Sequence, residues 1–163
     1  MKNPGLWVLS KAIGSLCEKK NLKIAVAESC TGGLLSSVIT DVSGSSKYFV
    51  LGTVVYSKEQ KKKLLKIPES VLRKYSPVSE EAVLLMAENV RKLARTDLGI
   101  GITGYAGPSG GTKKNSKGTV YIAVSGKGFT RSRKYLFRGE RGLVKEKAVY
   151  SALLFLKELL EKK

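Results

Sequence analysis

The sequence predicts an α/β protein, a three-layer α/β/α sandwich with a mixed, mostly parallel sheet. Amphipathic helical patterns alternate with short apolar strand patterns along most of the chain, which favours a sheet with helices on both faces. Two consecutive strand patterns around Gly126-Lys127-Gly128 predict a β-hairpin, so we expect a mixed rather than a purely parallel sheet. At 163 residues, we expect one domain over residues 1–163.

In the first half of the chain, residues 6–20 carry apolar side chains at helical spacing. Residues 22–27 form a short apolar strand pattern, and the glycine-containing turn after it leads into a helix that we expect to start near Thr31. The alternating, β-branched segment 48–56 predicts a strand. Residues 58–65 and 70–75 predict two short helices, the first of which stops near Pro68.

In the second half, Ser79 precedes two acidic residues, which is typical of a helix N-cap, and this helix is expected to run to about Arg95. A strand over residues 97–103 leads into a glycine-rich segment and then a polar loop, 112–117, which we expect to be mobile. Strands at 118–125 and 130–137 form the hairpin. After a connector, the last helix covers residues 143–160.

The net charge and the residue types of the chain limit the kinds of molecule that it is expected to bind. Thirty Lys and Arg against 13 Asp and Glu give a net charge of +17, which attracts nucleic acid or phosphorylated small molecules. Aromatic residues do not alternate with the basic ones, so we expect only non-specific attraction to nucleic acid. No apolar run is long enough to span a membrane, no leader pattern is present, and the two cysteines lack metal-ligand spacing. We expect a cytoplasmic protein that uses no metal ion and no cofactor.

The motif with the most chemical content is Ala27-Glu28-Ser29-Cys30-Thr31-Gly32-Gly33, which places hydroxyl and thiol groups where a strand turns into a helix. The chain has no histidine, so Ser-His-Asp and Cys-His nucleophile systems are excluded. A lysine, a carboxylate or a tyrosine must then serve as the base for Ser29. Ser29 as a simple N-cap is the more common role of such a serine, and Cys30 is an alternative nucleophile. A desolvated lysine of the 58–63 cluster would be a competent base, but the spacing does not say which one.

A second glycine-rich segment, Gly104–Gly111, also follows a strand. Ligands of open α/β sheets bind at the carboxyl ends of strands, and glycine-rich turns present backbone N–H groups to an anion or an oxyanion. The segment lacks the lysine of a Walker motif. Arg138 and Arg141 flank the start of the last helix, where a guanidinium can clamp phosphate, although a plain surface role is equally common.

Four motifs in this order resemble the CinA C-terminal domain family, the family of the nicotinamide-nucleotide amidase. They are the segments 27–33, Gly52-Thr53-Val54-Val55-Tyr56-Ser57, Gly104–Gly111 and Gly118-Thr119-Val120. The resemblance covers nearly the whole chain. It implies an α/β/α fold and hydrolysis of nicotinamide mononucleotide (NMN) to nicotinic acid mononucleotide and ammonia, in pyridine-nucleotide recycling, by a metal-free serine–lysine mechanism. It also suggests a homodimer.

Carried over onto matching positions, the resemblance implies that Ser29 is the nucleophile and Lys61 its base, with Tyr56 and Thr103 assisting. The residues it implies for substrate binding are Cys30, Thr31, Gly32, Gly33, Gly104, Gly107, Gly110 and Arg141, of which Arg141 would hold the phosphate. The sequence departs from the family pattern at Ser109, where an Asp is usual, at Tyr105, and at Asn115-Ser116-Lys117. Two alternatives stay open: a non-catalytic nucleotide or nucleic-acid binding module, and an amidase for another small carboxamide.

Overall fold

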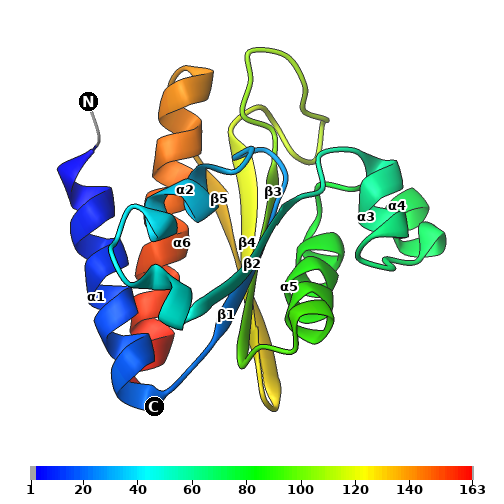
Figure 1. Cartoon of the computed structure of the whole chain (residues 1–163). Coiled ribbons are helices and arrows are strands. Elements are labelled where there is room, and N and C mark those ends of the chain that lie inside the picture. The colour runs from blue at the N-terminus through cyan, green and yellow to red at the C-terminus, as the bar shows by residue number, and fades with distance from the viewer. Residues whose placement is uncertain (1–2, 163) are drawn as a thin grey trace.

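A computed structural model describes residues 3–162 and places five strands in one sheet, in the order β2-β1-β3-β4-β5 (Figure 1). The strands are β1 (Ile24–Glu28), β2 (Phe49–Val54), β3 (Leu98–Gly104), β4 (Thr119–Gly126) and β5 (Phe129–Leu136). β1 pairs in parallel with β2 and β3, whereas β4 pairs antiparallel with β3 and β5. Four strands therefore point the same way and only β4 is reversed, which confirms the predicted mixed, mostly parallel sheet.

Helices cover both faces of this sheet, as Figure 1 shows. One face carries α1 (Pro4–Lys20), α2 (Leu34–Thr40) and α6 (Arg141–Glu161), and the short 3₁₀ helix η1 (Ser45–Lys47) leads into β2. The other face carries α5 (Glu80–Ala94), with α3 (Lys58–Lys63) and α4 (Glu69–Tyr75) projecting beside it. The three-layer arrangement is therefore confirmed. Among the helices of residues 3–162, none combines the length and apolar character needed to cross a lipid bilayer.

The two interfaces between sheet and helices are apolar. The α1–α6 side buries one large cluster that includes Ile24, Val26 and Ile100, and α5 packs on the opposite face. There the fit is close because β3 carries glycines. A Cβ added at Gly99 would lie 2.1 Å from the carbonyl oxygen of Ala87 in α5. α5 can therefore approach the β3 backbone directly, which holds the strand that ends at the glycine-rich segment.

Two boundaries differ from the predictions in ways that matter for the site. The helix expected near Thr31 begins at Leu34, because Gly32 and Gly33 have φ angles of +61° and +95° and form a left-handed turn before it. The last helix begins at Arg141, two residues earlier than expected. Arg141 is therefore held at the first turn of a helix rather than in a connector.

The polar loop that we expected to be mobile is anchored at Asn115, which is only 5% exposed. Its side-chain amide donates to the carbonyl oxygen of Val78 (3.0 Å) and accepts from the hydroxyl of Tyr121 (2.9 Å). A buried amide with both ends paired fixes its backbone. The prediction of a mobile loop therefore does not hold at its centre.

Candidate functional site

The carboxyl ends of β1, β2 and β3 meet at one edge of the sheet, and a cavity of about 370 Å³ opens there. Its wall combines the turn after β1, the segment after β2 with α3, the glycine-rich segment after β3, and the first residue of α6. This is the position at which open α/β sheets bind ligands. The cavity brings together segments that are separated by more than a hundred residues in the sequence.

At the inner end of the cavity, the ammonium nitrogen of Lys61 lies 2.9 Å from Ser29 Oγ and 2.9 Å from the carbonyl oxygen of Val55. Lys61 is 2% exposed and Ser29 is 7% exposed. Ser57 caps α3 by accepting from the backbone N–H of Gln60, and the helix it starts turns Lys61 inward. Lys61 is thus the inward-facing lysine of the 58–63 cluster, which spacing alone did not identify.

The backbone holds this pair in place from both sides. The N–H of Ser29 donates to the carbonyl oxygen of Ile102 in β3 at 3.0 Å. The N–H of Val55 donates to the carbonyl oxygen of Glu28 in β1 at 2.8 Å. The hydroxyl and the acceptor that orients the lysine are therefore fixed to adjacent strands, which is the rigid support that a reactive pair needs.

Burial changes the acid–base properties of this lysine. Removal from water lowers the pKa of Lys61 from 10.5 to about 8, because desolvation penalises the charged form. A neutral amine has one lone pair and two N–H groups. It can accept a proton from Ser29 while it continues to donate to Val55, so the geometry suits a general base.

Cys30 lies beside Ser29 and also lines the cavity. Burial raises the pKa of its thiol to about 12, and the nearby charge of Lys61 offsets only part of that effect. The thiolate is the nucleophilic form of cysteine, and it is scarce at neutral pH when the pKa is so high. The arrangement therefore favours Ser29 over Cys30 as the nucleophile.

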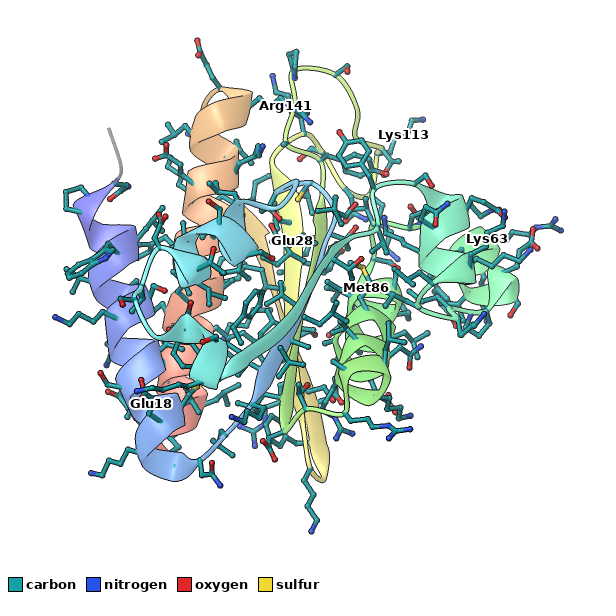
Figure 2. The ribbon with its side chains drawn as sticks, viewed as in Figure 1. Glu18, Glu28, Lys63, Met86, Lys113 and Arg141 are labelled. Atoms are coloured by element: carbon teal, nitrogen blue, oxygen red, sulfur yellow. The ribbon has the colours of Figure 1, made fainter. Side chains whose placement is uncertain are left out.

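Glu28 is the residue that the sequence reasoning overlooked. Its fully buried carboxylate accepts from the N–H groups of Gly33, Leu35 and Ser36, at 3.1, 3.1 and 2.8 Å, and from Ser36 Oγ at 2.8 Å. Figure 2 labels it over the sheet, on the side near α2. Glu28 satisfies the free N–H groups at the start of α2, a task the N-cap interpretation gave to Ser29. The only sequence signal was an acidic residue at the end of an apolar strand.

At the mouth of the cavity, Arg141 joins two of its walls. Its guanidinium donates to the carbonyl oxygen of Gly107 at 2.7 Å and to the hydroxyl of Tyr56 at 2.9 Å. Tyr56 is 60% exposed, and Figure 2 labels Arg141 beside the glycine-rich segment. Arg138 does not line this cavity, so only the second of the two arginines considered lies at the site.

Of the remaining predicted site residues, some line the cavity and the others lie outside its lining. Gly104 and Gly107 line the cavity, whereas Gly110, Gly32 and Gly33 do not. Thr103 is buried and donates to the carbonyl oxygen of Pro77 at 2.9 Å. Thr31 is fully buried, and its hydroxyl has no hydrogen-bond partner among residues 3–162. The roles assigned to these residues by resemblance stay predictions.

The cavity is also lined by residues to which the sequence reasoning assigned no catalytic or binding role. These are Lys58, Pro77, Val78, Tyr105, Ala106 and Ser109. In the described part of the chain the wall holds three basic side chains, from Lys58, Lys61 and Arg141, and no Asp or Glu. No group of three or more His, Cys, Asp or Glu side chains suited to a metal ion occurs among residues 3–162.

A family model and two curated relatives show which known proteins this chain resembles. A family model described as the CinA C-terminal domain matches residues 8–160. A CinA-like protein of Syntrophus aciditrophicus is 47% identical over 153 residues, which cover 93% of this chain and 36% of that protein. A putative competence-damage inducible protein of Desulforudis audaxviator is 41% identical over 155 residues, covering 95% of this chain and 38% of that protein. The chain thus spans little more than a third of the length of these curated relatives.

Solved structures match over almost their whole length. A crystal structure of a CinA superfamily protein from Klebsiella pneumoniae 700603 superimposes with a TM-score of 0.94 at 30% identity, covering 99% of this chain and 100% of that one. The competence or damage-inducible protein from Enterobacter asburiae gives a TM-score of 0.92 at 37% identity, covering 95% and 98% of the two chains.

Proposed function

The chain belongs to the CinA C-terminal domain family, and on that premise we propose that it hydrolyses the carboxamide of NMN to nicotinic acid mononucleotide and ammonia. The observation that carries the proposal is the 2.9 Å contact between Ser29 Oγ and the buried amine of Lys61. A hydroxyl beside a desolvated lysine is a nucleophile with its base. The volume of about 370 Å³ falls within the range of small-ligand sites, about 300–1,000 Å³.

In the first step, neutral Lys61 takes the hydroxyl proton as Ser29 Oγ attacks the carboxamide carbon, giving a tetrahedral oxyanion. The N–H groups of Gly32 and Gly33 already donate to Ser29 O and to Glu28. Of the residues that follow Ser29 in this turn, only Cys30 lines the cavity, so we assign the oxyanion to the N–H group of Cys30. A backbone donor of this kind stabilises the charge that develops in the transition state.

In the second step, protonated Lys61 delivers its proton to the amine as the carbon–nitrogen bond breaks, and ammonia leaves. This step creates an ester between Ser29 and the nicotinoyl group. Lys61, neutral again, takes a proton from water, which attacks the ester. The carboxylic acid is released, and the hydroxyl of Ser29 is restored with the proton that Lys61 returns. Tyr56 and Arg141 lie at the mouth, where they support the rest of the substrate.

Ammonia release tests the proposal. Purified protein is incubated with NMN, with and without a chelator, and both ammonia and nicotinic acid mononucleotide are measured. We expect equal amounts of the two products and no effect of the chelator. If the protein releases ammonia from other small carboxamides but not from NMN, the substrate assignment is wrong. If it releases none and binds nucleotides with an affinity that falls steeply with salt, the binding-module alternative replaces the proposal.

A further inference from the structure

We propose that Lys58 recognises the phosphate group of the substrate. The cavity therefore selects carboxamides that carry a negative charge over analogues that carry none. This inference rests on the proposed amidase function and adds a specificity residue to it. Lys58 is the first residue of α3, one turn before Lys61, and it is one of the residues that line the cavity. Residues three apart on a helix lie on the same side.

The charge of the cavity wall points to a negatively charged ligand. Its basic side chains are Lys58, Lys61 and Arg141, and no carboxylate of residues 3–162 lines it. A concave surface with charges of one sign concentrates ligands of the opposite sign. The substrate that fits this wall carries at least one negative charge in addition to its carboxamide.

Of these three basic side chains, only that of Lys58 forms no hydrogen bond or ion pair within residues 3–162. Lys61 is bound to Ser29 and Val55, and Arg141 is bound to Gly107 and Tyr56. The exposed ammonium of Lys58 has no ion pair or hydrogen bond within the described residues. It is therefore available to bind an anion without first breaking an interaction of its own.

The other lysines of α3 serve as an internal contrast. Lys62 pairs with Glu69 at 2.7 Å, and Lys63 pairs with Glu59 at 3.4 Å. Neither lines the cavity, and Figure 2 labels Lys63 in the part that projects away from the sheet. Acidic neighbours thus neutralise the outward-facing Lys62 and Lys63, whereas Lys58 has no acidic partner in the described part of the chain.

The different depths of Lys61 and Lys58 in the cavity determine the orientation of the bound substrate. Lys61 is 2% exposed, whereas Lys58 is exposed, so one marks the inner end and the other the mouth. The carboxamide must reach Ser29 at the inner end, and the anionic end then stays near Lys58, where water still solvates it. This orientation avoids the cost of burying a phosphate completely, and lysine binds phosphate as a point charge.

The test compares Lys58→Gln with Lys63→Gln, which removes the same charge from the same short helix on the outside. The value of kcat/KM is measured with NMN and with nicotinamide riboside, which has the same carboxamide but no phosphate. We expect Lys58→Gln to lower kcat/KM for NMN by about 10- to 100-fold, mainly through KM, the size of one lost charged hydrogen bond. The riboside should change by less than about threefold, and Lys58→Arg should retain most of the NMN activity.

The proposal is wrong if Lys58→Gln affects both substrates equally, or if it behaves like Lys63→Gln on NMN. If the protein is not an amidase for these compounds, the unaltered protein itself releases ammonia from neither NMN nor nicotinamide riboside, which distinguishes this result from a failure of the Lys58 proposal. In that event, calorimetric titration of NMN into the two variants still decides the matter. Weaker binding by Lys58→Gln alone supports the phosphate contact, and equal binding overturns it.

Discussion

Replacement of Lys61 by methionine tests whether this lysine is a desolvated amine. Methionine has a similar length but no charge, so the variant removes the group that burial penalises. Because burial lowers the pKa of Lys61 from 10.5 to about 8, the folded protein loses this proton at a lower pH than the unfolded chain. With about 1.4 kcal/mol for each pKa unit, the penalty below pH 8 is about 3 kcal/mol.

The direction in which the free energy of unfolding changes with pH follows from the number of protons that each state binds. Between pH 8 and 10.5 the unfolded chain holds a proton at Lys61 that the folded protein has lost, so the free energy of unfolding rises with pH over that window. In Lys61→Met this rise is absent. We expect the stability of Lys61→Met relative to the unaltered protein to fall by about 2–3 kcal/mol from pH 7 to pH 10. The lost hydrogen bond to Val55 shifts the comparison by a constant amount and does not change this slope.

The assay is urea unfolding followed by circular dichroism at pH 7, 8, 9 and 10. Lys63→Met is the matched control, because Lys63 is exposed on the same helix and its replacement should leave the slope unchanged. The same Lys61→Met protein should lack amidase activity. If the stability difference between Lys61→Met and the unaltered protein stays constant across this range, Lys61 is not a desolvated base.

Three further predictions follow from the site. The kcat/KM for NMN should rise with pH through an apparent pKa of about 8 and then level off, because only neutral Lys61 can accept the proton; a flat profile between pH 6 and 9 would contradict that role. Glu28→Gln should lower the free energy of unfolding by about 2–3 kcal/mol, measured in urea, because an amide cannot accept from all four donors. In the same variant kcat should fall while KM changes little, and unchanged kcat would show that the turn needs no such support. Cys30→Ala should keep kcat within about tenfold, because the thiol stays protonated; loss of all activity in well-folded protein would make Cys30 the nucleophile.

The fold could be predicted because its signals are local. Apolar runs of strand length, the glycine pair in the hairpin and the N-cap at Ser79 each act within a few residues. The start of α2 was predicted wrongly for a physical reason. The acceptor for its N–H groups is Glu28, which precedes the helix by several residues, whereas the sequence offered Ser29 as a closer candidate for the cap.

The site could be predicted only in part. Ser29 stood out because the chain lacks histidine, but which lysine faces it depends on the direction in which α3 leaves β2. The unpaired state of Lys58 depends on Glu59 and Glu69 binding its neighbours instead. Such contacts depend on the packing of α3 and α4, and no periodicity in the sequence reports them.

Whether Ser29 attacks the carboxamide with Lys61 as its base is decided by the turnover of Ser29→Ala on NMN. Ammonia release by this variant is compared with that of the unaltered protein, and calorimetry checks that NMN still binds. We predict a loss on the order of 10³-fold or more in kcat with binding retained. Turnover within tenfold of the unaltered protein would show that Ser29 is not the nucleophile.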